Sequence, residues 1–402
     1  MNVDELVRDS LRGQATETVS VPRGFADRVL TVRRRRRTRR LAAVAAATTA
    51  AVAIAVAVPT LESGKDDVRL ATEKNRNDVI AHPDQLPPRD MIAAGDVALA
   101  AYYTLKNVKQ TDDRAVAVRE YRLLDQKSGT YEKAAKWSFI DVAPGMRTAA
   151  VLENDLPTKR IGLLDLFTGE VERWIPVDRG VAGVRFSPDG SKLVATTYSR
   201  NPDLQYLVVR DPDGKKDDWR PGSERPCCLS SRTGFYLIDV DSGKGSWNGV
   251  ASPGHVGNHV RQDFAFSHDG KLVYPTLDSG MRYYDFEGNQ VDQPANEKWL
   301  HWGYGAGVSP NGKLVATGSV HDVYSVKQDA DVVQVSRRQF LAWADNKRLV
   351  AWGCAPKTCD GKDGNRRLLL LTIGSDKVVQ LSGPRRASTD YPGYWIPLFA
   401  SR

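Results

Sequence analysis

The sequence predicts an all-β fold, namely a six- or seven-bladed β-propeller preceded by a single transmembrane helix. Three observations lead to this prediction. A four-residue turn motif recurs in three places, each time before a similar β-rich stretch. A second hairpin motif with an acidic turn also recurs along the chain. An uncharged apolar segment follows a run of arginines near the amino end.

Residues 1–40 form a basic segment that we expect to be cytoplasmic. They hold 11 Arg and five Asp or Glu. Because basic residues stay on the cytoplasmic side of a membrane helix, the run of arginines predicts an amino end inside the cell. The residues of this run are Arg33, Arg34, Arg35, Arg36, Arg37, Arg39 and Arg40.

Residues 41–58, LAAVAAATTAAVAIAVAV, predict a membrane-spanning helix without charges. At about 1.5 Å per residue this segment is roughly 27 Å long, close to a hydrocarbon core of roughly 30 Å. Ala55-Val56-Ala57 has the form of a signal-peptidase site, but the basic lead is long for a cleaved signal peptide. Arg39-Arg40 also loosely resembles a twin-arginine export signal. We favour an uncleaved anchor, with 59–90 as a linker and 91–402 as an extracytoplasmic propeller.

The recurring turn motif is SPDG at 187–190, SHDG at 267–270 and SPNG at 309–312. Proline presets φ at its position, Asp or Asn suits the next one, and Gly adopts the left-handed conformation at the last. The stretches SKLVATT, KLVYPTL and KLVATGS follow, and their β-branched residues favour strands. Each copy therefore predicts one hairpin of one propeller blade.

Acidic hairpin turns mark the second half of each repeat. Examples are IGLLDLFTGEVERW from residue 161 and FYLIDVDSGKGSW from residue 235. Their spacing of about 40 to 46 residues is typical of a four-stranded blade. We expect blades near 91–135, 136–176, 180–248, 258–294, 302–337 and 338–383. A seventh blade could lie within the long third unit.

Two further segments stand out from the repeats. Residues 199–233 form an insertion with its own strand-like stretch YLVVR, which could be a binding loop or a solvated excursion. The final stretch YPGYWIPLF, residues 391–399, is strongly apolar for a chain end. We expect it to close the fold by pairing with or packing on the first blade.

Four cysteines suit an oxidising compartment. Cys354 and Cys359, in CAPKTC, close a short loop and are the candidate disulfide. Cys227 and Cys228 are adjacent and could be free, strained or paired elsewhere. Because the cysteines lack the spacing of a zinc site, we expect no metal and no cofactor.

The densest aromatic group, WLHWGYG, gives the candidate binding surface: Trp299, His301, Trp302 and Tyr304. Such side chains can line a mouth that binds sugar or peptide, and they can equally pack between blades. Propellers of prolyl-oligopeptidase relatives serve a separate hydrolase domain with a Gly-x-Ser-x-Gly motif. The sequence has neither, so we expect no enzyme activity.

The overall charge of +8 does not indicate nucleic-acid binding. The excess lies in residues 1–40, whereas the rest of the chain has 46 Lys or Arg and 44 Asp or Glu. A nearly neutral exported part lacks the basic footprint of a nucleic-acid-binding domain. The arginines are explained by topology and by attraction to anionic headgroups.

The repeated turns resemble those of exported propellers of the TolB kind and of WD40-repeat-like proteins. The resemblance covers about residues 91–399. The Arg-ending lead, the Ala-rich span and the unit SRTGFYLIDVDSGK look more narrowly like membrane-anchored WD40-repeat proteins of actinobacteria. His268 replaces the usual proline and blade-ending Trp-Asp pairs are absent, so WD-repeat partners are not implied. Residues 60–90 are too short for the additional domain on which TolB's partners depend.

These observations favour a membrane-anchored, non-catalytic scaffold that binds a protein or another ligand. The alternative is a transmembrane sensor whose residues 1–40 bind a transcription regulator such as a sigma factor. Residues 1–40 lack the His-x3-Cys-x2-Cys zinc motif of many anti-sigma domains. The partner's identity and the oligomeric state do not follow from the sequence.

Overall fold

The computed structural model describes residues 70–402 with gaps. The gaps are 75–76, 210–216, 222–229, 253–260, 277–281, 299, 301–304, 318–321, 326–329, 335–338, 355–365 and 385–394. The basic segment with its arginines and the expected membrane span therefore lie outside the described residues. Within the described part of the chain, no helix is long and apolar enough to cross a bilayer.

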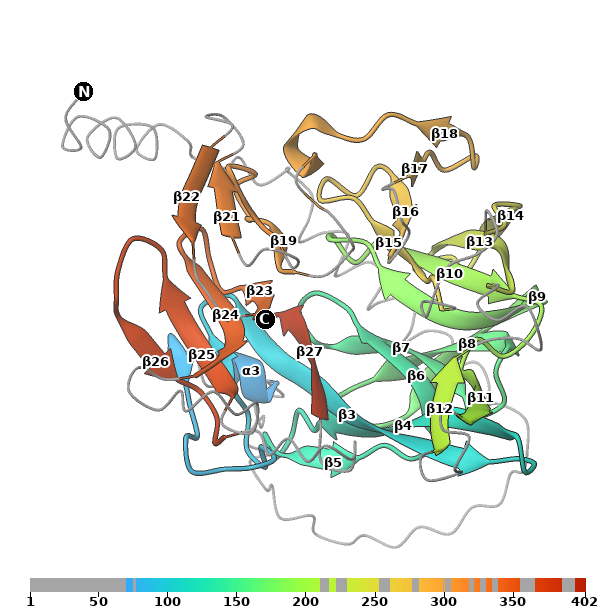
Figure 1. Ribbon diagram of the computed structural model, residues 1–402, viewed down its shortest axis with the longest axis horizontal. Coiled ribbons are helices and arrows are strands. Elements are labelled where there is room, and N and C mark those ends of the chain that lie inside the picture. Colours follow the sequence, from blue (N-terminus) through green and yellow to red (C-terminus); the bar gives the residue numbers. More distant parts are fainter. Residues whose placement is uncertain are drawn as a thin grey trace, which may run out of the picture. The chain divides into compact units, whose positions relative to one another are not determined.

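The described residues form an all-β structure of five antiparallel sheets (Figure 1). The helical elements among them are short, namely α3 (Ala71–Lys74) and the 3-10 turn η1 (Ala295–Glu297). The expected all-β class is thus confirmed.

The first sheet joins the two ends of the described chain. Its strands are β1 (Val79–Ile80), β2 (Ala93–Ala94), β3 (Val97–Lys109), β4 (Arg114–Leu124), β5 (Tyr131–Lys133), β11 (Leu204–Val209), β12 (Asp217–Pro221) and β27 (Trp395–Ser401). Strand β27 pairs antiparallel with β3, from Trp395 opposite Thr104 to Ser401 opposite Val97. This pairing confirms the expectation that the apolar carboxyl-terminal stretch pairs with the first repeat (Figure 1).

The second sheet contains two of the expected repeats. Its strands are β6 (Trp137–Val142), β7 (Thr148–Glu153), β8 (Thr158–Asp165), β9 (Val171–Phe186), β10 (Lys192–Tyr198), β13 (Arg232–Asp239) and β14 (Gly245–Asn248). The long strand β9 pairs with β8 through residues 171–176 and with β10 through residues 181–186. One continuous strand therefore serves as the last strand of one repeat and the first strand of the next.

Three four-stranded sheets follow, in the expected intervals 258–294, 302–337 and 338–383. The first contains β15 (Phe264–Phe266), β16 (Val273–Pro275), β17 (Tyr283–Tyr284) and β18 (Gln290–Val291). The second contains β19 (Gly307–Val308), β20 (Leu314–Ala316), β21 (Asp322–Ser325) and β22 (Ala330–Gln334). The third contains β23 (Gln339–Trp343), β24 (Arg348–Gly353), β25 (Arg367–Thr372) and β26 (Val378–Gln380).

The repeated turns form as the sequence predicts. In each copy the serine hydroxyl lies 2.5 to 2.9 Å from the Asp or Asn side chain two residues later. The same serine oxygen accepts a backbone N–H five residues later, which starts the next strand. The closing glycines Gly190, Gly270 and Gly312 have φ of 71° to 72°, a region that side chains with a Cβ rarely adopt.

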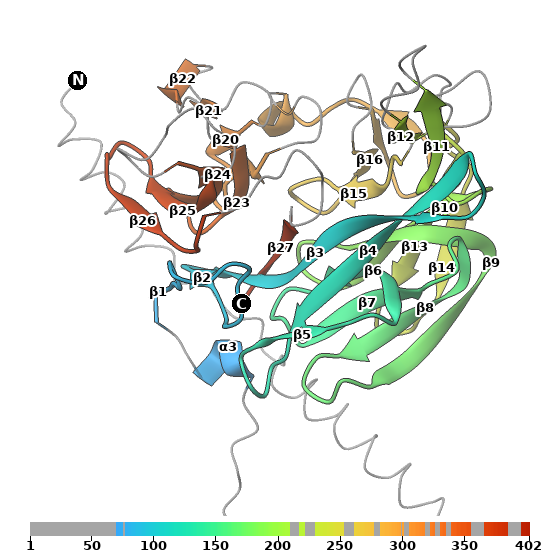
Figure 2. The ribbon, with the colours of Figure 1, turned by 60° about the horizontal axis from the view of Figure 1, so that its bottom comes forward.

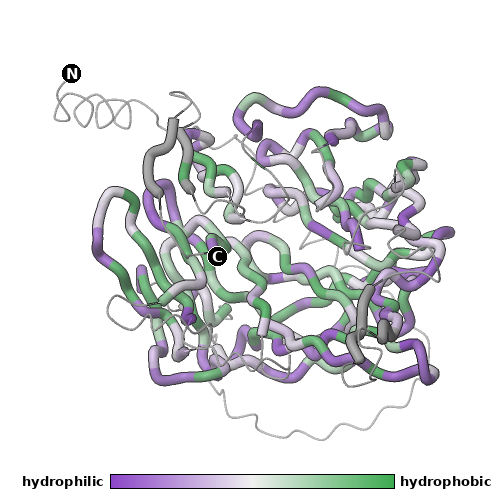
Figure 3. The backbone as a smooth tube through the Cα atoms, viewed as in Figure 1, coloured by the Kyte–Doolittle hydropathy of each residue, from purple (hydrophilic) through white to green (hydrophobic). Residues whose placement is uncertain are grey.

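The core consists of sheets packed against each other through both faces. On β24 and β25, Val350 and Leu370 pack in a cluster with residues of the first sheet, such as Leu99. Their neighbours Leu349 and Leu371 pack in a different cluster with Val323 of β21. A strand that is buried on both faces has a continuous run of apolar residues in its sequence. The tube coloured by hydropathy shows such runs with hydrophilic turns between them (Figure 3).

The folded unit begins earlier than expected. It extends from Asp67 to Arg402, so the segment assigned to a linker at 59–90 belongs to it in large part. Leu70 is 2% exposed, and the His82 N–H donates to the Leu381 carbonyl over 2.9 Å. Arg348 forms an ion pair with Asp78 at 2.6 Å. Val79, Ile80 and Leu86 also pack against the main core cluster. The polar composition of the segment concealed this packing, because its apolar residues are few and are spread between polar ones.

Candidate functional site

A cavity of about 590 Å³ is lined by strands from all five sheets. The lining includes Val97 of β3, Arg185 of β9, Phe266 of β15, Val308 of β19, Trp343 of β23 and Phe399 of β27. Its volume falls within the range of roughly 300–1,000 Å³ that is typical of ligand sites. The cavity is therefore the principal candidate site in the described part of the chain.

The repeated turns bring equivalent positions to this cavity. The second residue of each turn motif belongs to the lining: Pro188, His268 and Pro310. Each turn follows a strand whose end also lines the cavity, so the repeat itself builds the wall. The replacement of proline by His268 places an imidazole in a wall that is otherwise largely apolar.

Arg185 is the permanently charged side chain of the cavity wall. Its Nη1 donates to Asp141 Oδ1 over 2.7 Å, and its side chain is 41% exposed while that of Asp141 is 10% exposed. The second oxygen of Asp141 accepts the Phe186 N–H over 2.8 Å. Burial raises the pKa of Asp141, although Arg185 and this N–H act in the opposite direction. The pair fixes the guanidinium in place beside the cavity.

A second group of charges is buried among three parts of the chain. Asp203 accepts bidentate hydrogen bonds of 2.6 to 3.0 Å from both Arg119 and Arg261. Arg261 also contacts Asp263 at 2.8 Å, and Tyr198 donates to Asp263 over 2.9 Å. Burial alone would raise the pKa of Asp203, but the two guanidiniums hold it well below its usual range.

These charges fix the insertion on the first sheet. Strand β11 pairs with the beginning of β4, with Leu204 opposite Val116, and it continues as the hairpin β11–β12 (Figure 2). The insertion expected at 199–233 therefore extends an existing sheet and contributes no seventh unit in its described residues. Asp203 stands immediately before β11 and joins it to Arg119 of β4 by an ion pair.

A buried carboxyl group supports the turn that carries His268. Glu297 is 1% exposed, and its Oε1 accepts the His268 N–H over 2.6 Å. Its Oε2 accepts the Tyr283 hydroxyl over 2.6 Å. Burial raises the pKa of Glu297, and these two hydrogen bonds act in the opposite direction. No ion pair of Glu297 occurs among the described residues.

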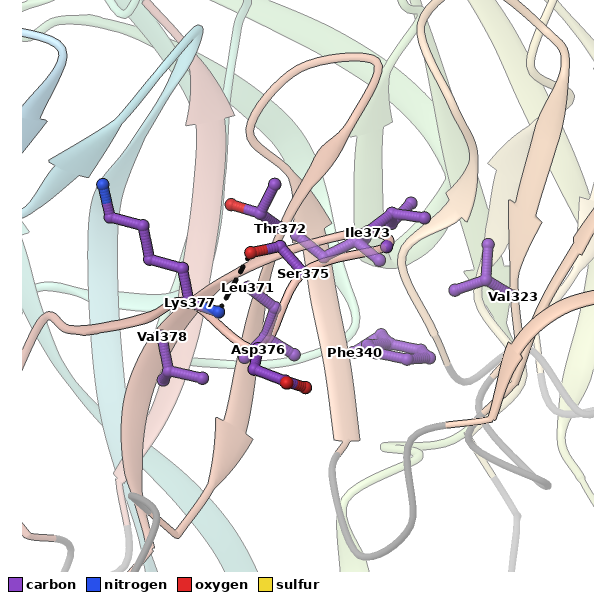
Figure 4. Close-up of a pocket in the computed structure, with 11 residues that line it drawn as sticks. Val323, Phe340, Leu371, Thr372, Ile373, Ser375, Asp376, Lys377 and Val378 are labelled. Atoms are coloured by element: carbon purple, nitrogen blue, oxygen red, sulfur yellow. Dashed lines mark hydrogen bonds between the residues drawn. The ribbon is translucent and has the colours of Figure 1, made fainter. Parts of the chain in front are cut away.

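A smaller pocket of about 230 Å³ lies at the turn between β25 and β26 (Figure 4). Val323, Phe340 and Leu371 supply apolar side chains to it. Of its labelled polar residues, Thr372 ends β25, whereas Ser375, Asp376 and Lys377 belong to the turn. In this turn the Lys377 N–H donates to Ser375 Oγ over 3.1 Å. This pocket lacks the convergent polar groups that give a site specificity.

The residues predicted from the sequence fall mostly outside the described ones. This holds for the aromatic candidates Trp299, His301, Trp302 and Tyr304, and for Cys227, Cys228 and Cys359. Cys354 is disulfide-bonded, and its pairing with Cys359 stays a prediction because Cys359 lies outside the described residues. The described residues contain no group of three or more His, Cys, Asp or Glu side chains that could hold a metal.

The sequence analysis missed the charged pairs. Arg185 stands in VAGVRF, two residues before a turn motif, where the other two copies have Ala265 and Gly307. The available signal was a charged residue in this otherwise apolar stretch before the turn. Nothing in the sequence joined Arg119 to Asp203, because the two are 84 residues apart.

The described residues thus define an all-β protein of several antiparallel sheets around a shared cavity. No family model and no curated protein matches the chain. Among solved structures it is similar to hydrazine synthase from Kuenenia stuttgartiensis, at 15% identity and a TM-score of 0.34. That match covers 61% of this chain and 65% of the other. So distant a likeness carries no argument about function.

Proposed function

We propose that this chain is a membrane-anchored, extracytoplasmic β-propeller of six blades that acts as a non-catalytic binding scaffold. In this proposal residues 41–58 span the membrane and the arginines before them stay in the cytoplasm. The cavity that carries Arg185 is the binding site for a protein or another ligand.

Sheet packing supports the propeller. The first sheet shares a core cluster with β6–β8 through Val151 and with β24–β25 through Val350. Strands β10 and β13 share another cluster with β15 and β16 through Phe235 and Phe264, whose rings are 4.8 Å apart. Repeated sheets that pack face to face in chain order are typical of a propeller. The pairing of β27 with β3 joins the carboxyl-terminal strand to the first sheet, which supports closure of such a fold.

The observation that carries the binding role is the cavity lined by all five sheets. Ligand sites are concave, mostly apolar, and carry a few placed polar groups. Phe266, Trp343 and Phe399 give this cavity an apolar wall, and Arg185 and His268 give it polar groups. Ser267 also lines the cavity, beside His268. Its hydroxyl donates to Asp269 and accepts the Leu272 N–H within the turn, so its hydrogen bonds serve the turn, and binding accounts for the lining better than catalysis.

Crosslinking and affinity capture from native membranes test the proposal. The full-length protein is compared with a variant whose residues 3–30 are scrambled while the arginine run and residues 41–58 are kept. Recovery of the same envelope partners with both proteins supports the scaffold. Recovery of a cytoplasmic partner with the native segment alone supports the sensor instead. Protease accessibility of the folded unit from the cytoplasmic side would contradict the topology.

A further inference from the structure

A second pocket, of about 260 Å³, lies on one face of the first sheet. Leu86 and Pro87 line one part of it. Tyr102 and Trp395 also line it, but they are 4% and 1% exposed, so little of either side chain is accessible. The two ring centroids are 5.2 Å apart. The Tyr102 hydroxyl already donates to the Pro88 carbonyl over 2.9 Å, so Tyr102 contributes its ring to the pocket.

The register of four strands places charged side chains beside these rings. Lys133 of β5 stands directly opposite Arg122 of β4, and Arg122 stands opposite Tyr102 of β3. Two residues along the same strands, Glu120 stands opposite Thr104, which stands opposite Trp395. Residues that are opposite, or two apart on one strand, share a face of the sheet. All of these side chains also line the pocket.

The charges at the pocket are not balanced. Like charges directly opposite each other in an antiparallel sheet are destabilising, yet Arg122 and Lys133 are such a pair. In the part of the chain that the structure describes, neither forms an ion pair. Glu120 is the one acidic residue of the lining, and it forms no ion pair among the described residues either. The pocket mouth therefore carries an excess of positive charge next to buried aromatic rings.

We propose that this pocket binds a small aromatic carboxylate. The ring of the ligand would pack against Leu86 and Pro87 and reach the accessible parts of Tyr102 and Trp395. Its carboxylate would bind Arg122 and Lys133. Aromatic rings gain from offset or edge-to-face contact with other rings. Arg and Lys form charge-assisted hydrogen bonds with carboxylates. The volume lies just below the usual range of roughly 300–1,000 Å³, which suits a ligand of one or two fused rings.

The site is distinct from the cavity that carries Arg185, because the two pockets share no lining residue. The proposal therefore stands even if the scaffold function fails. It requires the positive charges of Arg122 and Lys133 beside the apolar lining of the pocket. It also predicts that Glu120 lowers the affinity for the ligand, because its carboxylate repels the anion.

The test is a ligand-observed NMR titration of the full-length protein in nanodiscs with 1-naphthoate. The neutral amide 1-naphthamide is the matched probe. We expect saturable binding of the acid, at least tenfold weaker binding of the amide, and weaker binding of the acid at high salt. Equal affinities for acid and amide, or no saturable binding of the acid, would overturn the proposal.

Variants locate the site. The double variant R122Q/K133Q is expected to weaken naphthoate binding at least tenfold, whereas Glu120→Gln is expected to tighten it severalfold. Because Glu120→Gln increases binding, a damaged fold cannot mimic its effect. Lys106→Gln removes an exposed cation of β3 that does not line the pocket and should leave binding unchanged. Full binding by the double variant, or no gain with Glu120→Gln, would contradict the assignment.

Discussion

Arg261 donates to both carboxylate oxygens of Asp203, over 2.8 Å from Nε and 2.6 Å from Nη2. Both side chains are largely buried, with 16% and 8% exposed. Asp203 belongs to the insertion, whereas Arg261 precedes the first strand of the following sheet. The contact therefore links two parts of the chain that the sequence separates by 58 residues.

Removal of the Asp203 charge should destabilise the protein strongly. Asp203→Asn leaves Arg119 and Arg261 buried without their shared anion, which typically costs about 3–5 kcal/mol. Urea unfolding followed by tryptophan fluorescence measures the change. The control is Arg160→Gln, which breaks an ion pair whose arginine is 51% exposed. We expect no measurable change in its unfolding midpoint, and equal effects of the two substitutions would contradict the account.

The buried Glu297 should make stability depend on pH. Its pKa is raised in the folded state by burial. Its contribution is therefore complete below the unfolded pKa of about 4.3 and is lost as pH rises through the folded value. Glu297→Gln removes this titration, so the variant should gain stability relative to the wild type between about pH 4 and pH 7. Parallel stability curves over that range would argue against a raised pKa.

Trp395 should stabilise the folded protein by holding β27 against β3. Its side chain is 1% exposed and its ring lies 4.8 Å from that of Trp352. Trp395→Ala should lower the free energy of unfolding by about 3–5 kcal/mol, the usual cost of truncating a buried tryptophan. The measurement is chemical denaturation, with Trp174→Ala as the control, since Trp174 is only half-buried. A smaller effect at Trp395 than at Trp174 would show that the closing strand contributes little.

The close approach of Gly183 to Asp263 predicts a requirement for glycine. A Cβ at this position would collide with the Asp263 carboxylate, so Gly183→Ala must displace the group that Arg261 and Tyr198 contact. Overpacking of this kind costs about 1–3 kcal/mol. Thermal unfolding of the alanine variant checks this, and an unchanged midpoint would mean that the carboxylate shifts without cost.

Local rules account for the parts of the fold that were predicted. The turns around Gly190, Gly270 and Gly312 form from residues adjacent in sequence, so their chemistry is visible without a structure. The apolar run of residues 391–399 also predicted pairing with the first repeat, because so apolar a stretch favours burial. The aromatic candidates near Trp299 remain predictions, since they lie outside the described residues.

The ion pairs and the cavity could not be predicted from the sequence, because they join residues that are far apart in the chain. The Arg119–Asp203 and Arg185–Asp141 ion pairs join residues 84 and 44 positions apart. Neither has a local spacing pattern. The cavity has the same origin, because its lining comes from all five sheets and each sheet contributes only a few residues.

The most direct test of the central claim is to block the cavity and measure partner capture in living cells. Val308→Arg places a long charged side chain in the cavity wall, whereas Val108→Arg changes a valine that is 38% exposed and does not line it. The scaffold account predicts that crosslinked envelope partners are lost with Val308→Arg and kept with Val108→Arg, at equal protein levels. Undiminished capture by a folded Val308→Arg variant would contradict the claim that the cavity is the binding site.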